Sequence, residues 1–170
     1  MPRLHVCSLA RISEMVALTG ARSLVTLISP GTLVVRPAEI APHRHRTIAM
    51  SDIITPLPGQ VLPDSEHVGD LIDFVRAWDR AEPMVIHCYA GVSRSTAAAF
   101  IAACALNPAR DEFGIARAIR AASPTATPNA RLVALADLQL GRGGRMTAAI
   151  AEIGRGEDCL EGVPFALELA

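Results

Sequence analysis

The segment that decides the fold is MVIHCYAGVSRSTAAAFIAACAL, residues 84–106. Its first residues form a continuous apolar run, which is typical of a strand buried on both faces. A short loop follows, and the alanine-rich run over 95–106 has the length and composition of a buried helix. Because strand, loop and helix follow one another directly, the N–H groups of the loop and of the helix N-terminus converge. The segment therefore predicts an anion-binding site in residues 88–94, here called the anion loop.

The side chains of the anion loop suit it to a tetrahedral oxyanion. Gly91 permits the unusual backbone conformation that such a loop needs. Arg94, at the start of the helix, can donate to two oxygens of the anion. Cys88 lies at the base of the loop, where the same positive field stabilises a thiolate nucleophile. Ser95 can donate a hydrogen bond to its sulfur. The alternative interpretation of Cys88 is a buried core cysteine.

The rest of the chain alternates between strand and helix patterns, with a proline-rich loop over 51–64. The alternation predicts one α/β domain with a three-layer fold, in which a central, mostly parallel sheet is flanked by helices. Its parts are an N-terminal βαβ unit (1–44), a core (45–141) and a C-terminal helix and tail (142–170). Strands are expected over 4–9, 23–29, 44–50 and 83–88, and helices over 12–20, 65–80, 95–106, 111–122, 129–141 and 145–154.

Composition narrows the partners. The chain has 170 residues, 51% of them hydrophobic, and a net charge of −1, so nucleic acid and acidic membranes are not favoured. All 16 basic residues are arginine, which together with the high alanine content suggests a GC-rich bacterial source. The N-terminus carries charges where a signal peptide would be apolar, and the uncharged run over 95–109 is too short to span a bilayer. We therefore expect a cytoplasmic protein.

Neither the cysteines nor two arginine-rich segments indicate a cofactor. Cys7, Cys88, Cys104 and Cys159 match no zinc-binding spacing, so we expect neither a metal nor a cofactor. Cys7 and Cys104 are expected in the core, and the sequence leaves open whether either forms a disulfide with oxidised Cys88. The segment PHRHR (42–46) lacks a third metal ligand and predicts a solvated loop and strand edge. The segment GRGGR (141–145) predicts a flexible joint.

The run HCYAGVSRS (87–95) resembles the HCxxGxxRS signature of the cysteine-dependent protein phosphatases. The resemblance is sharp over 84–106 and continuous over about 45–140, and the short chain looks more like the dual-specificity branch than the larger tyrosine-specific branch. SPTATPN (123–129) is similar to the RPxxxPN segment of that family, with Ser123 in place of arginine. The resemblance implies a metal-independent phosphomonoesterase that acts through a cysteinyl-phosphate intermediate.

The resemblance also assigns roles to residues. Cys88 is the expected nucleophile and His87 orders the loop and tunes the thiol. In the family an aspartate after a strand, some thirty residues before the cysteine, is the general acid, and Asp52 stands 36 positions before Cys88. Asp64 is the alternative acid, although it also suits a helix N-cap. The non-catalytic interpretation of Asp52 is that it forms an ordinary turn. The residues expected to bind the phosphoryl group are Tyr89, Ala90, Gly91, Val92, Ser93 and Arg94.

The expected substrate is a phosphorylated protein or peptide, or a small phosphomonoester. Phosphatases for highly phosphorylated inositols often carry extra basic residues in this loop, and here Arg94 is the only one. Two alternatives stay open at this point. One is a phosphate-binding pseudophosphatase that has lost turnover, and the other is a rhodanese-like or arsenate-reductase-like cysteine enzyme. The sequence leaves the oligomeric state open.

Overall fold

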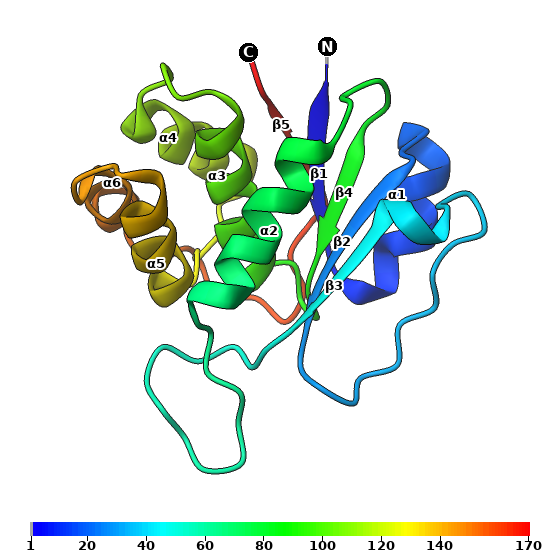
Figure 1. Cartoon of the computed structure of the whole chain (residues 1–170), viewed down its shortest axis with the longest axis horizontal. Coiled ribbons are helices and arrows are strands. Elements are labelled where there is room, and N and C mark those ends of the chain that lie inside the picture. Colours follow the sequence, from blue (N-terminus) through cyan, green and yellow to red (C-terminus); the bar gives the residue numbers. More distant parts are fainter. Residues whose placement is uncertain (1) are drawn as a thin grey trace.

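The computed structural model describes residues 2–170, which form an α/β fold around one five-stranded sheet (Figure 1). The strand order is β3-β2-β4-β1-β5. The first four strands in the chain are parallel, and β5 runs antiparallel to β1. The expected central, mostly parallel sheet is thus confirmed. The strands are β1 (Arg3–Cys7), β2 (Ser23–Ile28), β3 (His45–Ala49), β4 (Met84–His87) and β5 (Phe165–Glu168).

Helices cover both faces of the sheet and complete the expected three layers. One layer holds α1, and the opposite layer holds α2 to α6 (Figure 1). Within residues 2–170, no helix is both long and apolar enough to cross a membrane. The helices are α1 (Ile12–Thr19), α2 (Ser65–Ala77), α3 (Arg94–Leu106), α4 (Glu112–Ala122), α5 (Ala130–Leu140) and α6 (Arg145–Ile153), with short 3₁₀ turns at Leu9–Arg11 and Pro42–Arg44.

The decisive segment lies at the centre of this arrangement. All residues of α3 are buried, and this helix packs between the sheet and α2, α4 and α5. Its many alanines allow this close approach on every side. Strand β4 is the middle strand of the sheet and is buried on both faces. The anion loop therefore starts at the carboxyl end of the middle strand, where open α/β sheets bind their ligands.

The C-terminal segment corrects one expectation. The sequence predicted a helix followed by a tail, but Phe165–Glu168 forms β5 and pairs with β1 along its whole length. A four-residue strand of this kind is stable only through its partner, because so short a strand cannot hold itself in an extended conformation. On the way to β5, residues 154–164 pass the carboxyl ends of β1 and β4, and Gly162 N–H donates to the carbonyl oxygen of Ala90 (2.8 Å).

The GRGGR segment (141–145) is a fixed turn between α5 and α6 rather than a loose joint. Arg142 is buried and donates to Glu112 Oε1 (2.7 Å) and to the carbonyl oxygen of Cys104 (2.5 Å). The Asp137 carboxylate accepts hydrogen bonds from three backbone N–H groups at the start of α6. These contacts hold together the corner formed by α4, α5 and α6, and none of them involves the anion loop.

Candidate active site

Cys88 lies at the base of the anion loop and is only 3% exposed. Its Sγ accepts a hydrogen bond from the Gly91 N–H at 3.2 Å. The Ser95 hydroxyl, in the first turn of α3, lies 3.1 Å from the same sulfur. The loop and the first turn of α3 thus each place one hydrogen-bonding group on the sulfur.

Gly91 sets the shape of the loop. Its φ angle is +73°, in the left-handed region that residues with a Cβ rarely adopt. A Cβ at this position would lie 2.8 Å from the carbonyl carbon of Cys7 and 2.9 Å from the nitrogen of Ser8. The end of β1 therefore buttresses the loop so closely that only glycine fits. A further backbone bond, from Leu9 N–H to the Tyr89 carbonyl oxygen (3.1 Å), joins the same two segments.

Arg94 is a buried cation held by uncharged oxygens. It is 6% exposed, and its Nη1 donates to the Met50 carbonyl oxygen (2.8 Å) and to Ser29 Oγ (3.1 Å). Its Nε is buried without a hydrogen-bond partner, and none of the ion pairs in residues 2–170 involves this side chain. A buried charge without a counter-ion is costly, so this arrangement suits a site that receives an anion. Sequence reasoning missed Ser29 and Met50, which follow β2 and β3.

Asp52 reaches the other end of the anion loop. Its Oδ1 accepts hydrogen bonds from Ser93 Oγ (2.8 Å) and from Asn129 Nδ2 (3.0 Å). Both bonds go to Oδ1, and no hydrogen bond within residues 2–170 goes to Oδ2. Asn129 also caps α5 by accepting from Leu132 N–H (3.1 Å), so the helix fixes the amide that holds the aspartate. The PN pair of the SPTATPN segment was the only sequence signal for this contact.

Asp64, the alternative acid, has a structural task. Its carboxylate accepts the His67 N–H at 3.0 Å and forms the N-cap of α2, as the sequence predicted. The His67 ring returns a bond from its Nδ1, which accepts the Asp64 N–H at 3.0 Å. Among the hydrogen bonds of residues 2–170, none links Asp64 to the anion loop. The geometry therefore joins Asp52, not Asp64, to the site.

His87 belongs to a buried chain of hydrogen bonds. Its Nδ1 lies 3.0 Å from the Cys88 carbonyl oxygen, which can only accept, so Nδ1 carries the proton. Its Nε2 then accepts from Thr26 Oγ1 (2.8 Å), whose oxygen in turn accepts from His45 Nε2 (2.7 Å). Burial lowers the pKa of His87 to about 4, so the ring is neutral near pH 7. This chain of hydrogen bonds holds the backbone carbonyl of Cys88 in place beneath the loop.

The side chains of the three other cysteines take no part in these hydrogen bonds. Like Cys88, they are free thiols. Cys7 ends β1 beside His87 in the strand register, and burial raises the pKa of its thiol to about 12. Burial likewise raises the pKa of Cys104, within α3, to about 12. Cys159 is exposed in the 154–164 segment. In the described part of the chain, no three His, Cys, Asp or Glu side chains gather as a metal site would require.

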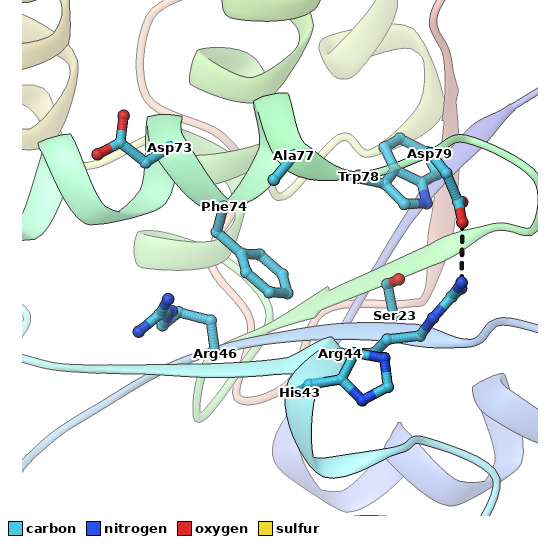
Figure 2. A pocket seen from close by; sticks show the side chains of 9 residues that line it. All are labelled: Ser23, His43, Arg44, Arg46, Asp73, Phe74, Ala77, Trp78 and Asp79. Carbon is cyan, nitrogen blue, oxygen red and sulfur yellow. Dashed lines mark hydrogen bonds and ion pairs between the residues drawn. The ribbon is translucent and has the colours of Figure 1, made fainter.

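Three side chains of the PHRHR segment, His43, Arg44 and Arg46, border a hollow of about 520 Å³ between β3 and α2, and no residue of the anion loop lines it (Figure 2). His45, by contrast, belongs to the hydrogen-bond chain that reaches His87. Arg44 pairs with Asp79 at 2.8 Å, and the guanidinium of Arg46 lies 5.7 Å from the centre of the Phe74 ring. The arginines of this hollow are therefore already partnered, and they add no charge to the anion loop.

Comparison with known proteins gives one family match and several similar folds. The protein-tyrosine phosphatase family matches residues 46–127. A mouse putative dual specificity phosphatase complexed with zinc tungstate has 17% sequence identity, a TM-score of 0.62 and coverage of 86% of both chains. Human DUSP28 has 17% identity and a TM-score of 0.62, with 82% of this chain and 92% of that chain covered. DUSP15 has 16% identity and a TM-score of 0.60, with 91% and 94% covered. No curated protein matches the sequence significantly.

Residues 46–127, which include the HCYAGVSRS loop, are thus similar to the protein-tyrosine phosphatase family. The fold is that of the dual-specificity phosphatases, because the three solved structures above share it over most of their length.

Proposed function

We propose that the protein is an active, metal-independent phosphatase that cleaves phosphomonoesters through a cysteinyl-phosphate intermediate. The observation that carries the proposal is Arg94, at the end of the loop that begins with Cys88: its guanidinium is buried, is held only by uncharged oxygens and has Nε unpaired. A tetrahedral dianion above the sulfur supplies the missing negative charge. The backbone N–H groups of residues 89–94 surround the remaining oxygens.

In the first step, the Cys88 thiolate attacks phosphorus while the bond between phosphorus and the leaving oxygen breaks. Asp52, protonated at Oδ2, gives its proton to that oxygen, so the product leaves as a neutral alcohol or phenol. Arg94 and the loop amides hold the equatorial oxygens of a loose transition state, in which charge placement dominates catalysis. His87 does not exchange protons with the substrate; it holds the Cys88 carbonyl.

In the second step, Asp52 is a carboxylate and takes a proton from water. The resulting nucleophile attacks phosphorus, the S–P bond breaks, and inorganic phosphate forms. The Cys88 sulfur leaves as a thiolate, which the hydrogen bonds from Ser95 and Gly91 stabilise. The two hydrogen bonds to Asp52 Oδ1 keep the carboxylate beside the loop for both steps. Because the carboxylate needed for both steps is held in place, we favour an enzyme that turns over its substrate rather than a protein that only binds phosphate.

The substrate class we propose is a phosphorylated protein or peptide. The anion loop carries one basic residue, Arg94, which is enough for one phosphoryl group and too few for a polyphosphorylated inositol. The similar mouse dual specificity phosphatase is complexed with zinc tungstate, and tungstate has the tetrahedral shape of phosphate. Both facts support a site built for a single phosphomonoester.

The test is hydrolysis of para-nitrophenyl phosphate between about pH 4.5 and 8, with EDTA present. Cys88→Ser should be inactive, and Asp52→Asn should slow turnover about 10²–10³-fold and alter the basic limb of the pH profile. Asp64→Asn is the matched control and should keep wild-type kcat. If the wild type binds phosphate but releases none from the ester, the protein is a binding module. Turnover of thiosulfate or arsenate instead would favour the sulfurtransferase or reductase alternative.

A further inference from the structure

A first hollow lies beside the start of the anion loop. It has a volume of about 380 Å³ and lies between the loop, the segment after β1 and the 154–164 segment. Two of its apolar side chains face solvent, since Leu160 is 99% exposed and Tyr89 is 65% exposed. Its lining residues are Ser8, Leu9, Ala10, Tyr89, Ala90, Leu160 and Glu161.

The wall that carries Leu160 is anchored to the rest of the site. Gly162 N–H donates to the Ala90 carbonyl oxygen at 2.8 Å, and a Cβ on Gly162 would lie 2.8 Å from the Gly91 carbonyl oxygen. The Ser8 hydroxyl donates to Glu161 Oε1 at 2.5 Å. The 154–164 segment is therefore fastened to the anion loop, and the first hollow is formed before any ligand arrives.

A second hollow lies at the opposite end of the anion loop. It has a volume of about 460 Å³ and includes Ser93 and Asp52, whose side chains bond each other. Most of its other lining side chains are apolar, and Ile54 and Leu57 are 54% and 47% exposed. These further residues are Ile53, Ile54, Thr55, Leu57, Thr127, Pro128, Asn129 and Ala130.

The position and the charge of the two hollows indicate what they bind. Tyr89 and Ala90 line the first hollow, and Ser93 lines the second. A peptide whose phosphorylated side chain is bound in the loop would therefore extend over the first hollow on one side and over the second on the other. Their linings contain two carboxylates, Asp52 and Glu161, and no arginine. Apolar neighbours of the phosphorylated residue fit such linings, whereas acidic neighbours are repelled.

We propose that the two hollows are subsites for apolar side chains on either side of the phosphorylated residue of an extended peptide. The inference rests on the proposed phosphatase activity and adds to it a preference for substrate sequence. An anionic lipid surface is the less favoured partner, because the carboxylates beside the loop would repel it.

The experiment compares phosphotyrosine peptides of equal length with leucine, alanine or aspartate at the two positions on each side of phosphotyrosine. We expect kcat/KM for the leucine peptide to exceed that for the aspartate peptide about tenfold, with alanine between them. Leu160→Ser should lower the ratio of kcat/KM for the leucine peptide to that for para-nitrophenyl phosphate. Leu138→Ser is the matched control, because Leu138 is 80% exposed on α5 and lines neither hollow.

Equal kcat/KM values for the three peptides would overturn the inference. So would an equal effect of Leu160→Ser and Leu138→Ser, or faster hydrolysis of a phosphatidylinositol monophosphate in vesicles than of any peptide. If para-nitrophenyl phosphate is not hydrolysed at all, the proposed function fails separately. The same peptides then decide the inference by calorimetric binding, in which the leucine peptide should bind about tenfold more tightly than the aspartate peptide.

Discussion

Two arginine side chains, Arg94 and Arg142, are equally buried in this protein, at 6% exposed, but their surroundings differ. Arg142, at the corner of α4, α5 and α6, has a carboxylate partner in buried Glu112 and a carbonyl partner in Cys104. Arg94, at the start of α3, has only Ser29 Oγ and the Met50 carbonyl, and its Nε is unpaired.

The difference distinguishes a structural ion pair at Arg142 from the proposed phosphate-binding site at Arg94. A buried pair with good geometry offsets much of the desolvation of both charges, whereas a buried cation with neutral partners keeps most of that cost. The fold therefore stabilises Arg142 by itself, while Arg94 is best stabilised by an anion from outside the chain. The two positions should respond to substitution in opposite ways.

The largest effect is expected at Arg94. Arg94→Met should lower kcat for para-nitrophenyl phosphate by about 10⁴-fold, because an arginine that stabilises a transferring phosphoryl group contributes on this scale. The free energy of unfolding should stay the same or rise, since a poorly compensated buried charge is removed. Steady-state kinetics and urea unfolding measure the two quantities. A stable variant with wild-type kcat would exclude the proposed role of Arg94.

Glu112→Gln should have the reverse profile. It leaves the buried charge of Arg142 without its carboxylate, so the free energy of unfolding should fall by about 3–5 kcal/mol. The kcat of the folded fraction should not change. Replacing both partners, as Glu112→Leu with Arg142→Met, should recover much of the loss in urea unfolding. A loss as large in the double variant as in Glu112→Gln would show that packing, not charge, dominates this corner.

His87 extends the comparison to a buried base that is neutral. Its pKa is about 4 in the folded protein and about 6.5 when unfolded, so its contribution is complete above pH 6.5 and is lost as the pH falls toward 4. The loss at pH 4 should be about 3 kcal/mol. His5 and His45 add to it, because burial lowers the pKa of both. Thermal unfolding against pH measures the slope, which His87→Gln should flatten.

If phosphate occupies the anion loop as proposed, it should stabilise the wild type, because only the folded chain presents that loop. At about one hundred times its Kd, the gain is about 2.7 kcal/mol, seen as a higher Tm. Arg94→Met should lose this gain, and Glu112→Gln should keep it despite its lower starting Tm. Equal stabilisation of wild type and Arg94→Met would show that the anion binds elsewhere on the protein.

The smallest effect concerns Thr26. Thr26→Val removes the hydroxyl between His45 and His87, and we expect a loss of about 1–2 kcal/mol in the free energy of unfolding. Thr26→Ser keeps the hydroxyl and should restore the stability. Because the hydrogen-bond chain ends on the Cys88 carbonyl, kcat should fall a few-fold in Thr26→Val only. Identical kcat values in the two variants would mean that the chain does not position the loop.

The sequence predicted the centre of the molecule well because local pattern and chemistry coincide there. The apolar run before Cys88, the glycine at 91 and the alanine-rich run after Arg94 each specify one element, and together they specify β4, the anion loop and α3. The three-layer fold followed from the alternation of elements. These features depend on residues near one another in the chain, so the local pattern of apolar residues is enough to predict them.

The features that sequence reasoning missed depend on residues far apart in the chain. Asn129 holds Asp52 across 77 positions, and Ser29 contacts Arg94 across 65. Strand β5 has too few residues to show a period, and only its pairing with β1 makes it a strand. No local pattern reports such contacts, because they arise when packing brings separate loops to one edge of the sheet.

The sheet connectivity has a consequence for the folding pathway. Strand β1, the first in the chain, lies between β4 and β5, so Leu4 pairs with both Met84 and Leu167. The backbone of β1, the first strand synthesised, therefore becomes fully paired only after β5, the last strand, has been made. Pairings of such long sequence separation slow folding, since the chain loses entropy before the contacts form. Folding of this sheet should accordingly be completed after synthesis of residue 168, with the anion loop and its 154–164 wall among the last parts to order.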